Sequence, residues 1–360
     1  MKLGDVCAKG KSNLRQKDLK NDGPYPVYGA SGIVGFSSDY QNADAYVAVV
    51  KDGAGVGRVM ACEPRSSVLG TMQALLPGKG TERDYLLHLV RSMDLGKGFT
   101  GSTIPHIYFK DYGKTLVRAL SREQQVEVAN RLSGIDHLIS QGKGQLSLLD
   151  DLVKSQFIEM FGTLEEPRSG IELKTIDSIC TSIVRGPFGS ALKKEYFVPW
   201  HPGVYKVYEQ KNAIRKQADI GDYYIEEAKF GELGRFECVP GDILMSCSGT
   251  MGELYQLPND AVPGVINQAL CKFTLDSKQI LAPYFLEIMS QAVGELGAKG
   301  SGIQNIASVK YVKAVRIPVP PVELQRQFAD LVARVDKLGF GIWLACKSLH
   351  EPITHFYHQI

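Results

Sequence analysis

The sequence lacks the motifs of most metal-binding and membrane proteins. Its seven cysteines form no CxxC pair, no histidine stands at metal-ligand spacing from them, and their odd number does not suggest a disulfide framework. No apolar run approaches the roughly 18 residues of a membrane span. The N-terminus MKLGDVCAKGK has no apolar core of signal-peptide length. We therefore expect a soluble, cytoplasmic protein with reduced thiols, no metal site and no membrane partner.

Catalytic signatures are missing as well. The seven histidines form no HExxH, and the chain has no nucleophile elbow and no Asn-Pro-Pro-aromatic signature of amino-methyltransferases. GAGVG at 53–57 matches a dinucleotide-binding loop only in part, because the third glycine is missing at the required spacing. GKS at 10–12 is preceded by Asp5 where a P-loop requires glycine. The sequence therefore predicts no catalytic residues.

Neither sign of charge dominates the chain, whose formal net charge is +2. Cations nevertheless concentrate in two stretches. Residues 1–20 contain six Lys and Arg against two acids, and residues 183–217 contain seven against two. A solvated lysine-rich surface would explain either stretch alone, but the recurrence favours a polyanionic partner.

The sequence does contain an internal duplication. QAL at 73–75 recurs at 268–270, and STIPHI at 102–107 is similar to SGIQNI at 301–306. A weaker similarity links LGDVC at 3–7 with IDSIC at 176–180. Because the shared positions are mainly apolar or turn-forming, they indicate two modules of one fold, and a chain of 360 residues can form two such cores.

Each module is followed by a segment in which apolar residues recur at alternating spacings of four and three. The seam positions are Val128, Leu132, Ile135, Ile139, Leu146, Leu149 and Val153 in the first segment, and Phe328, Val332, Val335, Ile342, Cys346, Leu349 and Ile353 in the second. This spacing predicts two helices that pair with each other. Gly142 and Gly339 would let their backbones approach closely, at a cost of about 1 kcal/mol of helix propensity each. Ordinary amphipathic helices packed on their own modules are the alternative.

Capping and breaking residues predict where these segments begin and end. Ser121 begins an S-x-x-Q cap, Gly162 ends the first helix, and PVPP at 318–321 precedes the second. β-rich runs such as 45–50 and 242–245, with helical stretches at about 84–95 and 283–296, indicate α+β modules. The expected division is 1–120, a central helix at 121–162, a linker at 163–169, a second module at 170–320 and a C-terminal helix at 321–360.

With this organisation the chain resembles the specificity (S) subunit of Type I DNA restriction-modification systems. The resemblance rests on YPVYGASGIVG at 25–35, on LDDLVKSQFIEMFG at 149–162 and on the tandem order of modules and helices. It implies an α+β fold with a pseudo-twofold internal repeat. Residues 1–120 and 170–320 would be two tandem target-recognition domains, separated by a pair of long helices that form an antiparallel coiled coil.

The resemblance also implies a non-catalytic, DNA-binding function. Each target-recognition domain would bind one half of a bipartite, asymmetric site in double-stranded DNA. The helices would hold the domains apart and dock two modification subunits, which methylate adenine, and restriction (translocase) subunits would join them. S-adenosylmethionine, ATP and Mg would be bound by those partners and not by this chain. A helical spacer of about 26 to 39 residues would span roughly 39 to 58 Å, or about 12 to 17 base pairs.

We expect DNA contacts from cationic and hydroxyl side chains on the loops of each module. The candidates are Tyr28, Ser31, Lys51, Arg58, Ser102 and Thr103 in the first domain and Arg185, Lys193, Lys194, Lys211, Ser246, Ser248 and Thr250 in the second. Each of these residues could equally be a surface or turn residue without a ligand.

One residue departs from the family pattern. Pro352 lies inside the second helical segment, where a proline removes a backbone hydrogen bond. We therefore expect that helix to kink or to end about one turn early, with an atypical second docking surface. Two other functions stay open. A coiled-coil interaction scaffold without DNA specificity would have no DNA affinity even at low salt, and an enzyme that uses the 53–57 loop would bind nucleotide tightly.

Overall fold

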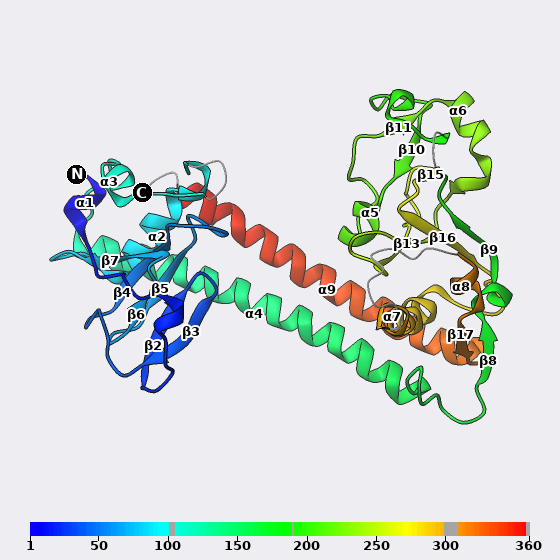
Figure 1. Ribbon diagram of the computed structural model, residues 1–360, viewed down its shortest axis with the longest axis horizontal. Coiled ribbons are helices and arrows are strands. Elements are labelled where there is room, and N and C mark those ends of the chain that lie inside the picture. The colour runs from blue at the N-terminus through cyan, green and yellow to red at the C-terminus, as the bar shows by residue number, and fades with distance from the viewer. Residues whose placement is uncertain (101–104, 189–190, 299–308, 358–360) are drawn as a thin grey trace. The chain divides into compact units, whose positions relative to one another are not determined.

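The computed structural model describes residues 1–100, 105–188, 191–298 and 309–357. By its internal contacts the chain divides into two compact units, Met1–Leu146 with Gly341–Ile360, and Ser147–Phe340. Each unit combines sheets with helices, so the mixed α and β class is confirmed (Figure 1). The unit boundaries fall inside the two long helices, and the division into five segments stays a prediction.

The first unit is built on a four-stranded antiparallel sheet with the order β1-β7-β4-β5. Its strands are β1 (Cys7–Lys9), β7 (Met72–Pro77), β4 (Tyr46–Val50) and β5 (Val59–Cys62). Val47 and Val49 of β4 join the core under α2 (Arg83–Ser92), whereas Tyr46 and Ala48 join the core on the opposite face. This alternation is that of a strand buried on both sides.

A second sheet packs on the face of the first sheet that is opposite α2. Its order is β3-β2-β6, with β2 antiparallel to β3 and parallel to β6. The strands are β3 (Gly32–Ser37), β2 (Tyr25–Gly29) and β6 (Ser67–Val68), and the remaining short helices are α1 (Leu3–Val6), η1 (Gln16–Asp18), η2 (Leu95–Lys97) and α3 (Phe109–Tyr112). Tyr28 and Val68 of this sheet pack with Tyr46 of the first sheet, so one core joins the two layers.

The second unit has a four-stranded antiparallel sheet with the order β14-β13-β16-β9. Its strands are β14 (Leu254–Gln256), β13 (Ile243–Ser246), β16 (Leu270–Leu275) and β9 (Cys180–Arg185). Ile243 and Met245 of β13 face a large core that includes α7 (Ala282–Ala298), and Leu244 faces a smaller core on the other side. The sheet is therefore also buried on both faces.

Two further sheets complete the second unit. The order of the larger one is β11-β10-β15-β12, with β10 parallel to β15, and β8 pairs with β17. The strands are β11 (Tyr224–Ile225), β10 (Tyr205–Tyr208), β15 (Gly264–Ile266), β12 (Glu237–Cys238), β8 (Glu172–Thr175) and β17 (Arg316–Val319). The short helices are η3 (Ile176–Ile179), η5 (Lys194–Tyr196), α5 (Gln210–Arg215), α6 (Glu227–Glu232), η6 (Gly234–Phe236) and α8 (Val309–Ala314).

The two units share one topology. The order β1-β7-β4-β5 of the first corresponds strand by strand to β9-β16-β13-β14 of the second, and each has a parallel pair in its other sheet, β2 with β6 and β10 with β15. Backbone contacts repeat as well, because Leu3 donates to the Thr115 carbonyl and Ile176 to the Val315 carbonyl, both over 2.9 Å. The duplication seen in the sequence is therefore a duplication of fold.

The first long helix, α4 (Arg122–Phe161), begins and ends where its caps predict. Ser121 Oγ accepts from the Gln124 amide over 3.3 Å, and Gln124 Oε1 accepts from the Ser121 amide over 2.9 Å, which is a capping box. Gly162, at φ +80°, stops the helix in the left-handed region that favours glycine.

Within the first unit, α4 packs against the C-terminal half of α9 (Val322–Tyr357). Leu132 and Ile139 of α4 are buried in a cluster that includes Leu349 of α9, with Val128 and Ile135 at its edge. A Cβ at Gly142 would clash with Sγ of Cys346 and touch Ile342. Leu146 is half-buried. A Cβ at this position would force the Cys346 side chain to move, so Gly142 allows the two helices to approach closely, as expected.

Within the second unit, the end of α4 packs against the start of α9. The rings of Phe157 and Phe328 are 5.4 Å apart, and Phe161 and Tyr284 complete an aromatic cluster. The other seam positions of this unit are buried or half-buried, namely Leu149, Val153, Val332 and Val335. This cluster attaches both long helices to α7.

Of the two outcomes expected at Pro352, the early end of α9 is wrong, and the kink stays a prediction. The helix continues through Pro352 to Tyr357. Proline removes one amide donor, but its fixed φ is compatible with helix, so a helix that is packed upstream at Leu349 can include it. The side chain of Ile353, the last predicted seam position, lies outside the described residues.

Candidate nucleic-acid interface

The predicted DNA contacts of the first unit include two residues of the β4–β5 loop, residues 51–58. Gly53, Gly55 and Gly57 have φ between +84° and +86°, which favours glycine. A Cβ at Gly57 would also clash with the backbone of Gly96. The loop joins two antiparallel strands, whereas a dinucleotide-binding loop joins a strand to a helix. This geometry argues against the nucleotide-binding alternative.

The same loop is attached to the segment 105–107. The Gly53 amide donates to the Pro105 carbonyl over 3.0 Å. Beside this bond, Nδ1 of His106 and Oδ1 of Asp52 are 2.8 Å apart, with both side chains about one-third exposed. Motif spacing did not identify this pair, because its members are distant in the sequence. The pair therefore joins the β4–β5 loop to the segment 105–107, next to the backbone bond.

Arg58 links the loop to the β2–β3 turn. Its Nη1 donates to the Ala30 carbonyl over 2.8 Å, and its side chain is exposed. Ser31, the next residue of that turn, is also exposed, and Lys51 at the base of the loop is half-buried. The fold therefore brings two loops that contain predicted contact residues into direct hydrogen-bond contact.

Tyr28 is a core residue, which corrects its prediction as a DNA contact. Its side chain is 8% exposed, and its Oη accepts from the Glu63 amide over 3.4 Å. Burial raises the pKa of the Tyr28 hydroxyl. The alternation of side chains along β2 places this ring between the two sheets. The glycines that follow Tyr28 are typical of a loop, so the sequence pattern did not indicate this burial. Ser102 and Thr103 lie outside the described residues.

The equivalent loop of the second unit joins β13 to β14 and comprises residues 247–253. Its Gly252, at φ +84°, donates to the Ser246 carbonyl over 2.8 Å. Ser246 is fully buried and donates through Oγ to the Thr250 carbonyl over 2.7 Å. Ser246 therefore stabilises the turn and cannot contact DNA, which is a second correction. Ser248 is half-buried and Thr250 is exposed, so both stay candidates.

Arg185 ends β9 at the base of this second loop. It is 8% exposed, donates through Nε to the Gln268 carbonyl over 3.2 Å and lies 4.9 Å from the ring centre of Phe188. A hydrogen bond from Cys271 and, to a smaller extent, the Arg185 charge lower the pKa of Cys247, the first residue of the loop. Arg185 is therefore bonded to the connection between β15 and β16 and exposes little of its own cation.

Three predicted lysine contacts lie next to or in short helices of the second unit. Lys193 and Lys194 are exposed at η5, and Nζ of Lys193 is 3.6 Å from the Glu195 carboxylate. Lys211 of α5 is half-buried, with its Nζ 2.7 Å from Glu209. Because its charge is already balanced, Lys211 should attract a DNA phosphate less than an unpaired lysine would.

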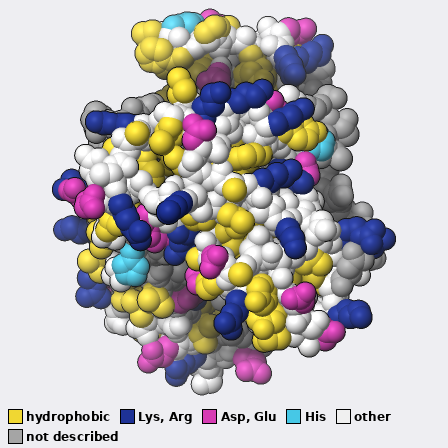
Figure 2. All heavy atoms as spheres, turned by 90° about the vertical axis from the view of Figure 1, so that its left-hand side faces the viewer, with side chains coloured by type: hydrophobic (Ala, Val, Ile, Leu, Met, Phe, Trp, Pro, Cys, Tyr) yellow, Lys and Arg dark blue, Asp and Glu magenta, His cyan; other side chains and the backbone are white. Residues whose placement is uncertain are grey.

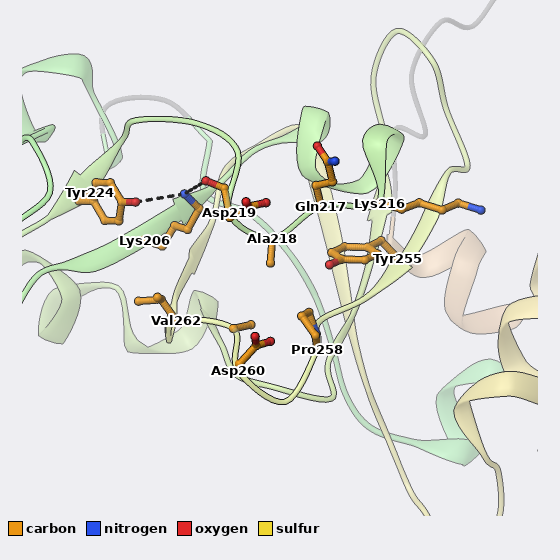
Figure 3. Close-up of a pocket in the computed structure, with 11 residues that line it drawn as sticks. Lys206, Lys216, Gln217, Ala218, Asp219, Tyr224, Tyr255, Pro258, Asp260 and Val262 are labelled. Carbon is orange, nitrogen blue, oxygen red and sulfur yellow. Dashed lines mark hydrogen bonds between the residues drawn. The ribbon is translucent and has the colours of Figure 1, made fainter. Parts of the chain in front are cut away.

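A cavity of about 400 Å³ lies beside the β11-β10-β15-β12 sheet of this unit (Figure 3). Lys206 of β10 borders it, is 1% exposed and donates to the Gly221 carbonyl over 2.9 Å and the Asp219 carbonyl over 3.4 Å. The Tyr224 hydroxyl is a third partner at 3.4 Å, and burial lowers the pKa of the lysine. A buried lysine with three oxygen partners needs no ligand. Its role is to hold the loop that contains Asp219 and Gly221.

The surface offers scattered cations. Figure 2 shows Lys and Arg in separate groups over one face, with Asp and Glu between them.

Within the described ranges, no three His, Cys, Asp or Glu residues lie close enough to hold a metal ion. None of the helices among the described residues is long and apolar enough to cross a bilayer. The arrangement supports contacts to phosphates and base edges from loops on two similar scaffolds.

Comparisons with known proteins find one matching family model and solved structures of similar fold. Residues 169–342 match a family model described as the Type I restriction modification DNA specificity domain. The fold is similar to that of a Type-I restriction-modification system S subunit from M. genitalium, with a TM-score of 0.60 and 16% identity over 99% of this chain and 94% of that one. A structure from a study of complex assembly and conformational transition of the type I R-M system gives a TM-score of 0.55 and 15% identity over 100% and 96% of the two chains. Among curated proteins none matches the sequence.

Proposed function

Residues 169–342 belong to the family of Type I restriction-modification DNA specificity domains, and from this premise we propose that the whole chain is a specificity subunit with a DNA-recognition domain in each half. The family match lies in the second half of the chain. The first unit repeats the sheet order of the second, β1-β7-β4-β5 for β9-β16-β13-β14. This duplicated topology is the observation that extends the assignment to the first half.

Each domain binds one half of a bipartite site in double-stranded DNA, and the two halves differ in sequence. Their difference follows from the two equivalent loops. The β4–β5 loop contains two cations, Lys51 and Arg58, whereas the β13–β14 loop contains the neutral polar residues Ser248 and Thr250. Because side chains that donate differently select different base edges, the site is asymmetric.

The two long helices act as a spacer in the form of an antiparallel coiled coil. Two contacts support this proposal, Gly142 with Cys346 in the first unit and Phe157 with Phe328 in the second. The later residue of α4 contacts the earlier residue of α9, which is the order of antiparallel helices. Helices of 40 and 36 residues are about 60 and 54 Å long. At about 3.4 Å per base pair this length leaves unread base pairs between the half-sites.

The outer faces of the same helices dock the modification subunits. Large apolar side chains outside the seam stay exposed on both helices, namely Val126, Leu138, Leu148, Leu152 and Ile158 on α4 and Leu324, Leu338, Phe340, Trp343 and Leu344 on α9. Because the seam does not cover these side chains, they are available for contact with a partner subunit. Two adenine methyltransferase subunits bind there, and restriction subunits join them in the cytoplasm. Those partners bind S-adenosylmethionine, ATP and Mg, so this chain is not itself an enzyme.

The proposal is tested by selecting DNA from a randomised duplex library with the complex of this chain and its modification subunits. We expect enrichment of two short sequence blocks with a constant gap, and an affinity that falls steeply with salt because phosphates are neutralised. If the assembled complex enriched no sequence even at low salt, the chain would instead be a coiled-coil scaffold without DNA specificity.

A further inference from the structure

A buried glutamine lies close to the start of each long helix and joins it to its own module. In the first unit Gln125 is 8% exposed. Its Oε1 accepts from the Glu82 amide over 2.9 Å, and its Nε2 donates to the carbonyls of Gly80 and Leu120 over 3.3 and 3.1 Å. One side chain thus makes three hydrogen bonds to backbone on two sides of the helix start.

The second unit repeats these bonds. Gln325 is fully buried, and its Oε1 accepts from the Leu281 amide over 2.8 Å. Its Nε2 donates to the carbonyls of Gln279 and Pro320 over 2.9 and 2.8 Å. The spacing is the same in both units. The backbone amide that donates to Oε1 lies two residues after the loop carbonyl that accepts from Nε2, and the other carbonyl that accepts from Nε2 lies five residues before the glutamine.

Only a side-chain amide can make this set of bonds. A carboxylate accepts but cannot donate, and an aliphatic side chain would leave one amide and two carbonyls unpaired in the interior. The bonded loop in each unit connects the main sheet to the module helix, β7 to α2 and β16 to α7. The glutamine therefore ties together the sheet that supports the recognition loops, the segment that enters the long helix, and the helix itself.

Further contacts make each junction rigid. In the first unit Nε2 of His88 on α2 is 3.1 Å from Ser133 Oγ on α4, and Arg91 forms an ion pair with Asp136 at 2.5 Å. In the second unit the aromatic cluster around Phe328 attaches α9 to α7. The junctions differ in chemistry, polar in one unit and aromatic in the other, but the glutamine is common to both.

We propose that Gln125 and Gln325 are positioning residues that fix the direction in which each long helix leaves its module, and thereby the half-site spacing that the protein accepts. This inference rests on the proposed function. A helix of about 60 Å that changes direction by about 5° moves its far end by about 5 Å, which exceeds one base-pair step of about 3.4 Å. Small losses of rigidity at these junctions therefore become whole base pairs at the DNA.

The experiment uses the complex with its modification subunits and the half-sites selected by the wild-type complex. Gln125→Met and Gln325→Met remove all three hydrogen bonds at similar volume. Gln141→Met and Gln327→Met make the same change at exposed positions of the same two helices and are the matched controls. Methyl transfer is measured on duplexes that have the native spacer and on duplexes with spacers one or two base pairs longer or shorter.

We expect the preference for the native spacer to fall by about tenfold or more in Gln125→Met and Gln325→Met, with base preference inside each half-site unchanged. In both controls the ratio of activities between spacers should equal that of the wild type, whatever their overall activity. An unchanged spacer preference would overturn the inference. So would an equal loss of activity at every spacing, because that is the result of a purely structural role.

If the methionine variants do not assemble, Gln125→Asn and Gln325→Asn replace them, since asparagine keeps the amide but is one methylene too short to reach all three partners. Failure of these variants to assemble would also indicate a purely structural role and overturn the inference. A wild-type complex that shows no bipartite preference would instead refute the proposed function, so the two failures are distinguishable.

Discussion

The close approach of the two long helices in the first unit can be tested with two glycines of α4 that are two residues apart. A Cβ at Gly142 would clash with Sγ of Cys346, whereas a Cβ at Gly144 has no neighbour within 4 Å. Alanine at Gly144 should stabilise by about 1 kcal/mol, the difference in helix propensity. Alanine at Gly142 gains the same propensity but overpacks the seam at a cost of about 1 to 3 kcal/mol. The two variants should therefore differ by about 1 to 3 kcal/mol.

The free energy of opening is measured by amide hydrogen exchange over residues 132–146, which reports this segment without requiring the two units to unfold together. Protection should rise in Gly144→Ala and fall or stay level in Gly142→Ala. Adding Cys346→Ala to Gly142→Ala removes the clashing sulfur and should restore part of the protection. If Gly142→Ala protected the segment as much as Gly144→Ala, the helices would not be in contact there.

Three further predictions concern single side chains. Arg58→Ala should weaken DNA binding by the complex and reduce the slope of log affinity against log salt by about one, and an unchanged slope in fluorescence anisotropy would exclude a phosphate contact. Burial, followed by the Arg91 charge, lowers the pKa of His88, so the unfolded chain takes up a proton first and the first unit should lose stability as pH falls below about 6.5. Thermal melts at a series of pH values should show this loss of stability, and the loss should be smaller in His88→Gln. Lys206→Met leaves two loop carbonyls unpaired, at about 1 to 3 kcal/mol each, and should increase hydrogen exchange in residues 216–222 selectively, whereas unchanged exchange would contradict its role.

The helices could be predicted from the sequence because their signals are local. The Ser121 cap, the stop at Gly162 and the apolar spacing each depend on neighbours within a few residues, and the structure places the helix ends accordingly. The duplication was visible because identical turns and apolar positions recur in order. The early end expected at Pro352 was wrong because the propensity rule ignores packing, which holds the helix upstream of it.

The site residues were harder to predict because loop and strand look alike in glycine-rich sequence. Tyr28 and Ser246 were chosen as loop residues, but the pairing of β2 and β13 places both side chains inside. The contacts of Asp52 with His106, and those of Gln125 with its loop, join positions more than 40 residues apart. Such pairs follow from the fold and leave no spacing in the sequence.

The most direct test of two recognition domains in one chain is a map of methylated adenines on DNA that was modified by the assembled complex. The account predicts one motif made of two different short blocks, separated by a constant number of unspecified base pairs. A single continuous motif, or methylation without any shared sequence, would contradict it.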